Sequence, residues 1–463
     1  MRRATTLWRA MPGRAASFPP TARPARLLPT AAIPSRIERP PETCQGYPHL
    51  HASARMPDSP APSFHHKPLT GPEDLALFGA PPVFDTPRHV NRPAAPDRAA
   101  FDAMMDAVWE RRWFTNDGPL VQELERRLSA FLDVPHCVLT SNATAGLDLV
   151  MQCLGIRGEV LLPSYTFIST AHLLALRGLT PVFCEVGTDM ALDPADAAAR
   201  LTERTDAVVA THVWGSPCDI DGLGALCDAA GIPLLFDAAH AFGARHQGHP
   251  LGRFGRAEVF SLHATKAFHT CEGGLITTCD AALADQLRLA RNFGFSGSDR
   301  VDCTGVNAKM SELHAAMGLA NLDAFPATRA AARAVHAAYR DGLAGLTGLR
   351  LKCPPAAEDN NHHYVVAEVD ARAFGLTRDR LVELLTAEGI WARRYFFPGG
   401  HRSPPHAAAN PGLSLPRTEA LCDRVMLLPG GGAADLAEVA EICRMIRFVA
   451  GSAAAIHNAG KAG

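Results

Sequence analysis

The sequence predicts an α/β protein with a seven-stranded, mostly parallel sheet and a smaller C-terminal α+β domain. Short apolar runs recur through the middle of the chain, at 137–140, 159–163, 181–185, 207–214, 233–236, 258–262 and 274–278. Most gaps between these runs hold 10 or more residues with apolar side chains at helical spacing, as crossovers between parallel strands require. After Leu322 the alternation gives way to longer helices.

Residues 1 to about 80 differ in composition from everything that follows. They are rich in Pro, Ala and Arg, with nine arginines before Met56 against only Glu38 and Glu42. No helical or strand period is sustained, so we expect an extension without packed structure. The Arg-rich, acid-poor start resembles a transit peptide. The simpler alternative, which we prefer, is that Met56 is the true start.

A helix, a turn and a second helix are expected before the first strand. Asp97 can cap a helix over Ala99–Arg111, and apolar residues recur at helical spacing over Leu120–Phe131. Between them, Asn116-Asp117-Gly118-Pro119 has the composition of a turn. This helical segment opens the large domain, which we place at 81–325.

The smaller domain is expected at 326–452, with a flexible tail at 453–463. It begins with a long Ala/Arg helix and contains four further predicted elements: a strand over Tyr364–Val369, a helix over Leu381–Glu388, a loop at 398–412 and a closing helix over Leu436–Val449. The loop is either a lid or an ordinary connector.

The composition argues against several classes of protein. The 463 residues carry 45 Lys+Arg and 47 Asp+Glu, a net charge of -2, so no nucleic-acid or membrane partner is expected. The most apolar stretch, 160–176, is interrupted by polar residues and does not fit a membrane span. Twelve cysteines without any C-x-x-C pair predict reduced thiols, a cytoplasmic location and no metal site, with Cys271 a small buried residue.

Two charged residues follow predicted strands, where open parallel sheets bind their ligands. Lys266 lies between the runs 258–262 and 274–278. Its amine could attack a carbonyl if its pKa were lowered, although a solvated surface lysine is the alternative. Asp237 follows the run 233–236, where a carboxylate is costly to bury without a partner. The alternative for Asp237 is a helix cap.

Two further strand ends carry features of a binding site. The small polar turn at 141–146 precedes a helix over Leu147–Met151, so its N–H groups could bind a phosphate, unless Asn142 or Ser141 simply caps the helix. The run 159–163 leads to an aromatic pair, Tyr165 and Phe167, which could stack on a flat ring or pack in the core.

These four features together describe a site for pyridoxal 5'-phosphate (PLP). This cofactor needs a lysine, an acid for its pyridine nitrogen, a phosphate cradle and a flat side chain against its ring. Neither G-x-G-x-x-G nor G-x-x-x-x-G-K-[ST] occurs in the sequence, which removes the usual dinucleotide and P-loop signatures.

From about Pro93 to Ile446, the chain resembles the DegT/DnrJ/EryC1/StrS family of sugar-nucleotide aminotransferases. The resemblance is carried by ordered motifs: Thr115-Asn116-Asp117-Gly118-Pro119, Pro163-Ser164-Tyr165-Thr166-Phe167, Phe236-Asp237-Ala238-Ala239-His240, Ser261-Leu262-His263-Ala264-Thr265-Lys266 with Glu272-Gly273-Gly274, and Gly305-Val306-Asn307-Ala308-Lys309-Met310-Ser311-Glu312.

This resemblance implies a PLP-dependent transferase of fold type I, the aspartate-aminotransferase-like fold. Lys266 would hold the cofactor through a Schiff base and later act as base and acid. Asp237 would pair with the pyridine nitrogen, His240 would lie near the phenolic oxygen, and Phe167 would stack on the ring.

The remaining implied residues bind the phosphate. Ala143, Thr144 and Ser261 would hold it within one subunit, and Asn307 would reach it from the neighbouring subunit. The resemblance therefore implies a homodimer with shared active sites.

Two departures from the family pattern affect binding contacts. Ser141-Asn142-Ala143-Thr144 replaces the usual Asn-Gly-Thr, so Ala143 must offer its N–H in a conformation that tolerates a Cβ. His269 stands where close relatives carry Asn, which leaves its substrate contacts open.

The family also implies a reaction. Related dehydratases carry histidine in place of Lys266, so the lysine favours transamination. We expect transfer of an amino group from L-glutamate to a nucleotide-linked keto-deoxysugar, with dTDP-4-keto-6-deoxyglucose as the expected acceptor. The alternatives are a 3-keto sugar or a non-catalytic PLP-binding regulatory protein.

Overall fold

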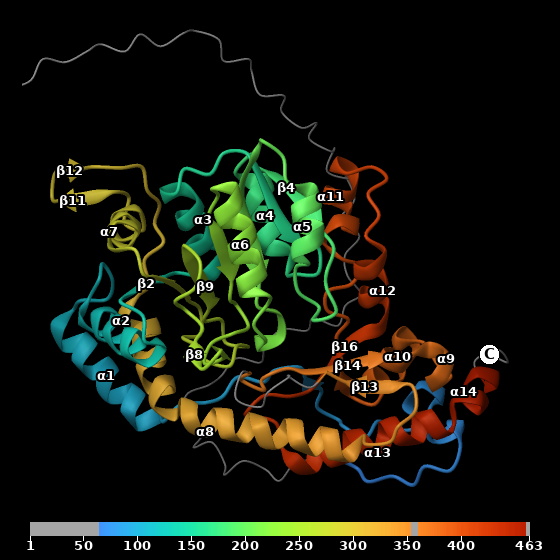
Figure 1. The fold of residues 1–463 in the computed structure, drawn as a ribbon. Coiled ribbons are helices and arrows are strands. Elements are labelled where there is room, and N and C mark those ends of the chain that lie inside the picture. Colours follow the sequence, from blue (N-terminus) through green and yellow to red (C-terminus); the bar gives the residue numbers. More distant parts are fainter. Residues whose placement is uncertain (1–63, 353–359, 460–463) are drawn as a thin grey trace, which may run out of the picture. The chain divides into compact units, whose positions relative to one another are not determined.

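The computed structural model describes residues 64–352 and 360–459, so the expectations for residues 1–63 and 460–463 lie outside it. Its centre is a seven-stranded sheet in the order β2-β10-β9-β6-β5-β3-β4 (Figure 1). The strands are β2 (His136–Thr140), β3 (Glu159–Pro163), β4 (Thr180–Cys184), β5 (Thr205–Thr211), β6 (Leu234–Asp237), β9 (Ala257–Ser261) and β10 (Gly274–Thr278). Only β10 runs antiparallel to its neighbours, β2 and β9. The predicted α/β fold class is confirmed.

The sequence prediction placed the end of one strand too late in the chain. The apolar run 207–214 was expected to be a single strand, but β5 ends at Thr211, whose partner is Asp237. Trp214 instead lies in a tight turn, η3 (Val213–Gly215), with φ 58°. That left-handed conformation cannot continue a strand.

Helices cover both faces of this sheet. The helices are α1 (Arg98–Arg111), α2 (Pro119–Leu132), α3 (Ala143–Cys153), α4 (Ile168–Leu176), α5 (Pro194–Arg200), α6 (Ile220–Ala230) and α7 (Ala281–Ala290). As expected, Asp97 caps α1, accepting a hydrogen bond from Ala99 N at 2.8 Å. Successive strand residues face opposite sides, so Leu161 and Leu162 lie in different hydrophobic clusters.

The C-terminal part builds a second core around a three-stranded antiparallel sheet, β13 (Leu349–Leu351), β14 (Val365–Val369) and β16 (Val425–Leu428). Its helices are α8 (Glu312–Gly342), α9 (Ala371–Phe374), α10 (Arg378–Ala387) and α13 (Leu436–Gly451), whereas α12 (Pro416–Arg424) packs Leu421 and Cys422 into a cluster on the large sheet. The boundary that we expected at 325/326 falls inside α8. Phe325 packs into a cluster on the large sheet, whereas Tyr339, on the same helix, packs into the second core.

The expectation that residues 1 to about 80 lack packed structure is wrong for residues 64–80. Residues 64–94, which we call the N-terminal strap, pack against the second core and include η1 (Pro72–Asp74) and η2 (Ala76–Phe78). Within the strap, β1 (Arg88–His89) pairs with β15 (Ile390–Trp391). The buried Glu388 carboxylate accepts hydrogen bonds from Ala76 N at 2.8 Å and Val83 N at 3.0 Å, so an acid far along the chain orders the strap.

Two more expectations about the C-terminal region change. The tail expected from residue 453 includes a helix, α14 (Ala453–Ala459), because Ile456 is fully buried in the second core. The loop 398–412 contains η4 (Gly400–Arg402) and α11 (Pro404–Ala409). Gly400 N donates to Ser164 O at 2.8 Å, and the buried His401 contacts Ser164 Oγ at 2.6 Å, which favours an anchored connector over a lid.

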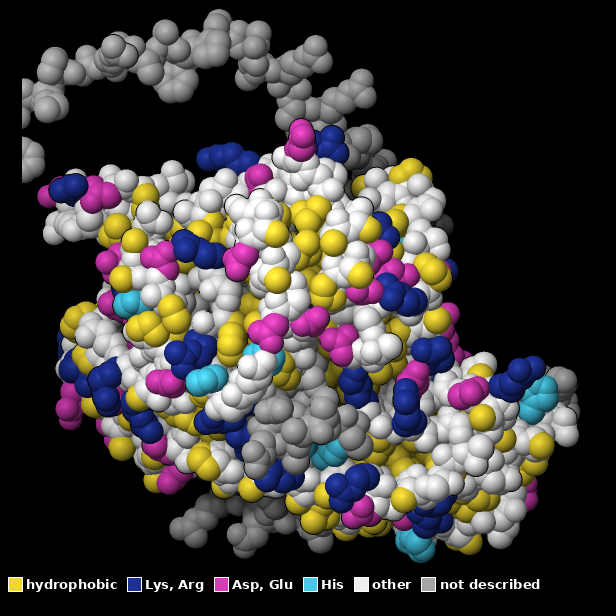
Figure 2. All heavy atoms as spheres, in the orientation of Figure 1, with side chains coloured by type: hydrophobic (Ala, Val, Ile, Leu, Met, Phe, Trp, Pro, Cys, Tyr) yellow, Lys and Arg dark blue, Asp and Glu magenta, His cyan; other side chains and the backbone are white. Residues whose placement is uncertain are grey.

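The surface agrees with the near-neutral composition. On the face drawn in Figure 2, Lys and Arg side chains are interspersed with Asp and Glu. Within the described residues, no helix has both the length and the apolar character needed to cross a membrane.

Candidate active site

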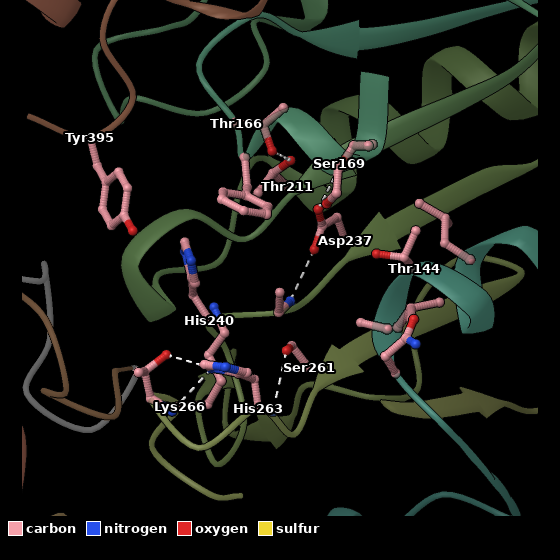
Figure 3. Close-up of a pocket in the computed structure, with 18 of the residues that line it drawn as sticks. Thr144, Thr166, Ser169, Thr211, Asp237, His240, Ser261, His263, Lys266 and Tyr395 are labelled. Atoms are coloured by element: carbon pink, nitrogen blue, oxygen red, sulfur yellow. Dashed lines mark hydrogen bonds between the residues drawn. The ribbon is translucent and has the colours of Figure 1, made fainter. Parts of the chain in front are cut away.

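A cavity of about 370 Å³ lies at the carboxyl ends of the parallel strands (Figure 3). Its walls come from the segments after β2, β3, β5, β6 and β9, with further residues from the second core and the strap. It contains seven of the residues that the sequence predicted, namely Ala143, Thr144, Phe167, Asp237, His240, Ser261 and Lys266. The strand-end argument therefore found a common site.

Lys266 lies on the loop between β9 and β10, as expected. The ends of this loop are held together because Ser261 pairs with Gly274. Its Nζ donates a long hydrogen bond of 3.5 Å to the Tyr364 hydroxyl. Burial lowers the pKa of Lys266 to about 8, although the attraction of the Asp237 carboxylate opposes this shift. Unlike a surface lysine, Lys266 can supply a neutral amine near neutral pH.

Asp237 is the last residue of β6 and is held from two sides. Its Oδ2 accepts a hydrogen bond from Thr170 Oγ1 at 2.8 Å, and its Oδ1 accepts one from Ala239 N at 3.1 Å. No helix begins at the following residues, so the helix-cap alternative does not apply. These bonds fix an acceptor carboxylate in the cavity wall (Figure 3).

The turn after β2 caps a helix and also leaves backbone N–H groups without a helical acceptor. Asn142 caps α3, accepting a hydrogen bond from Ala145 N at 2.8 Å. The N–H groups of Ala143 and Thr144 belong to the first turn, where the helix itself offers no acceptor. Ala143 has no positive φ, so its Cβ is tolerated. Thr144 and Ser261 also line the cavity, and their hydroxyl groups, together with these N–H groups, suit a phosphate.

Gly274 makes this cradle compact. A Cβ at this position would lie 2.4 Å from the backbone C and O of Asn142, closer than real Cβ atoms approach. A glycine is therefore needed where β10 passes the turn that opens α3.

Two aromatic residues are important at the cavity: Phe167, which lines it, and Trp214, which the sequence analysis missed and which packs behind its wall. Phe167 is 50% exposed and lines the cavity, so it does not pack in the core. The ring of Trp214 stacks on His240, with centroids 5.0 Å apart, and on Phe396 at 4.8 Å. Trp214 was hidden in the apolar run assigned to a strand.

The His240 ring is neutral. Burial lowers the pKa of His240 well below its ordinary value, and the positive charge of Lys266 lowers this pKa further.

Other cavity residues come from distant parts of the chain. Two residues of the strap and four of the C-terminal region line the cavity, namely Val90, Asn91, Tyr364, Arg393, Tyr395 and Phe396. None of them follows a strand of the large sheet, so the strand-end argument could not find them. Tyr364 immediately precedes β14, and an aromatic side chain at that point was the only available signal.

Three predicted or flagged residues lie elsewhere. Asn307 is exposed outside the cavity, where its Oδ1 accepts a hydrogen bond from Lys309 Nζ at 2.7 Å. Cys271 is exposed rather than buried, because the loop turns outward there in a left-handed conformation, φ 66°. His269 is buried and contacts Ala94 O at 2.8 Å, so it binds the end of the strap and does not line the cavity.

The residues present fit PLP. The cavity offers a lysine with a lowered pKa, a fixed carboxylate, free N–H groups at a helix N-terminus and an aromatic side chain at its mouth. Each matches one chemical requirement of this cofactor.

Comparison with known proteins agrees with this arrangement. Residues 96–447 match the DegT/DnrJ/EryC1/StrS aminotransferase family, whose members are PLP-dependent. A dTDP-4-amino-4,6-dideoxy-D-glucose transaminase of Shigella dysenteriae is 34% identical over 68% of this chain and 86% of its own length.

Solved structures give the same result. The structure of DesI in the presence of its TDP-sugar product is 45% identical, covers 82% of this chain and 96% of that chain, and has a TM-score of 0.78. DesV of S. venezuelae is 30% identical, covers 76% and 95%, and has a TM-score of 0.71. The chain therefore belongs to the DegT/DnrJ/EryC1/StrS aminotransferase family and is a sugar-nucleotide aminotransferase.

Proposed function

We propose that the chain uses PLP to transfer the amino group of L-glutamate to the C4 carbonyl of dTDP-4-keto-6-deoxyglucose. The observation that carries this choice is the name of the Shigella relative, a transaminase of the corresponding 4-amino sugar. DesI, crystallised with a TDP-sugar product, supports the same nucleotide. A 3-keto isomer remains the second candidate acceptor.

In this proposal the cavity residues divide the binding of PLP between them. Asp237 would pair with the pyridine nitrogen, and the N–H groups of Ala143 and Thr144 would hold the phosphate together with Ser261. Phe167 would cover the ring, and His240 would face its phenolic oxygen. When bound, PLP supplies a carbonyl carbon that can take up an amino group and a ring that withdraws electrons from it.

Lys266 moves the proton in both directions of the transfer. Its pKa of about 8 means that the amine is readily neutral, so it can take a proton from the carbon next to the transferred nitrogen. The resulting ammonium is stabilised by the Asp237 carboxylate, and it can return the proton at a neighbouring position.

We further propose a homodimer in which Asn307 of each chain reaches the cavity of the other. Asn307 is exposed, and so are the apolar side chains of Val306 and Leu313 nearby in the sequence and of Phe293, whose N–H donates to Val306 O at 3.2 Å. Clustered exposed apolar side chains are typical of an interface between proteins.

The test is incubation of the purified protein with L-glutamate and a panel of dTDP- and GDP-linked 4-keto and 3-keto sugars, followed by NMR of the product. We expect an amine at C4 of the dTDP sugar. Lys266→Ala should lower turnover by about a thousandfold or more, since it removes the proton carrier. Lys352→Ala, a lysine outside the cavity, is the matched control. An amine at C3 would establish the second candidate, and no amine from any sugar would refute the proposal.

A further inference from the structure

Five consecutive residues before β14 connect the second core to the loops of the active site. Asn360 and Asn361 begin this segment. Asn360 Nδ2 donates to Trp214 O at 3.0 Å, in the turn after β5. Asn361 Nδ2 donates to His240 O at 2.8 Å, in the turn after β6. Both amides are buried, so each fixes the backbone of one catalytic turn.

The end of the same segment reaches the lysine loop. His363 Nε2 contacts Thr265 O at 2.9 Å, and Tyr364 accepts the hydrogen bond from Lys266 Nζ. Burial lowers the pKa of His363 to about 4, so its ring is neutral and its Nε2–H donates to the Thr265 carbonyl. His363 thus binds the carbonyl of Thr265, and the adjacent Tyr364 binds the amine of Lys266.

We propose that Tyr364 is a catalytic residue that holds the Lys266 amine when that amine is free, and that His363 is the residue that positions the lysine loop for this contact. The inference rests on the proposed transfer through Lys266 and adds a partner for the amine. The proton moves only between Lys266 and the substrate, and Tyr364 keeps its own proton throughout.

The environment of Tyr364 fits this role. Burial raises the pKa of the phenol well above its ordinary value, so it stays neutral and can accept from an ammonium or donate to a neutral amine. The other titratable groups that act on Lys266 are Asp237 at the end of β6, His240 in the next turn, and His363. Because both histidines are neutral, Asp237 is the charged group among these that acts on the Lys266 amine. Tyr364 contacts the same amine through a neutral hydroxyl.

The test compares Tyr364→Phe with Tyr339→Phe. Tyr339 is a matched control because it is fully buried in the second core, outside the cavity, and its hydroxyl has no hydrogen-bond partner among the described residues. Trace labelling of the cofactor-free full chain with acetic anhydride, followed by peptide mass spectrometry, gives the pH midpoint of Lys266 reactivity. Tyr364→Phe should lower this midpoint by about half a unit, because the ammonium loses an acceptor. Equal midpoints in the two variants would overturn the proposal.

The holoenzyme supplies a second measurement. We expect Tyr364→Phe to slow the glutamate half-reaction about tenfold, as seen in the absorbance of the bound cofactor, and Tyr339→Phe to leave it unchanged. If the wild-type protein does not respond to glutamate, the proposed function fails. If the wild type responds and Tyr364→Phe responds equally fast, only the role of Tyr364 fails.

The positioning role of His363 has its own test. His363→Ala removes the donor to Thr265 O, and we expect kcat to fall about three- to tenfold with little change in the KM for glutamate. His363→Gln retains an N–H donor and should restore most of the loss. A glutamine variant as slow as the alanine variant would show that His363 contributes only packing and would overturn this role.

Discussion

Lys266 illustrates what a sequence can and cannot tell about a single residue. Its selection as the candidate reactive lysine follows from its place after a strand and from the motif around it. Its lowered pKa does not, because the burial that causes the shift is completed by the segment around Tyr364, 98 residues away. The same limit applies to Trp214, whose apolar neighbours made it look like part of a strand.

The pKa of Lys266 gives a prediction for the pH dependence of its reaction with PLP in the cofactor-free protein. The neutral amine is the form that attacks a carbonyl, so the rate at which the cofactor-free protein reacts with added PLP should rise with pH and level off above a midpoint near 8, rather than near the ordinary lysine value of 10.5. The Asp237 carboxylate raises the pKa of Lys266, so Asp237→Asn should move the midpoint to lower pH. Rapid-mixing absorbance between pH 6 and about 10 measures both. A midpoint unchanged in Asp237→Asn would contradict this electrostatic link.

At the scale of elements, the strands of the large sheet were predictable because they are short apolar runs, most of them buried on both faces, with the edge strand β4 partly exposed. Their boundaries needed more than hydrophobicity, as β5 shows. Strand order was also not evident in the sequence, since nothing local indicates that β10 inserts antiparallel between β2 and β9. This insertion brings Gly274 beside Asn142, at the turn that we propose binds the phosphate.

Gly274→Ala should test that arrangement. The added Cβ would meet backbone atoms of Asn142, which cannot rotate away, so β10 or the turn must shift. We expect about 1–3 kcal/mol of destabilisation and at least about tenfold weaker binding of PLP. Thermal unfolding and titration of the cofactor-free protein with PLP measure the two effects. Gly297→Ala, with open space around its Cβ, is the control. Unchanged PLP affinity in Gly274→Ala would show that the cradle does not depend on this approach.

At the scale of the whole molecule, the domain limits were the weakest part of the sequence prediction. The two cores are not built from separate stretches of chain, because α8 enters both and the N-terminal strap joins the second core from the opposite end of the sequence. The residue composition and the spacing of apolar residues show where the pattern of predicted elements changes along the chain. They do not show that Glu388 binds backbone groups more than 300 residues earlier.

The proposed dimer predicts complementation between two inactive chains. Lys266→Ala lacks the reactive lysine, and Asn307→Ala lacks the residue proposed to act in the other subunit. If each site combines Lys266 of one chain with Asn307 of the other, mixed dimers regain one intact site, and an equal mixture should recover up to about a quarter of wild-type activity. Exchange of subunits before the assay, followed by sedimentation to confirm the dimer, provides the measurement. No recovery from a fully exchanged mixture would place Asn307 in its own subunit's site or outside any site.

The N-terminal strap also affects how the protein should be shortened for production. The match to the family begins at residue 96, whereas Asn91, which lines the cavity, and Leu75, which is buried in the second core, both lie before it. A chain cut to residues 96–447 would keep Lys266 and Asp237, yet it would lose part of the cavity wall and expose the apolar surface that the strap covers. The boundary that similarity suggests for expression is therefore not the boundary at which the catalytic unit begins.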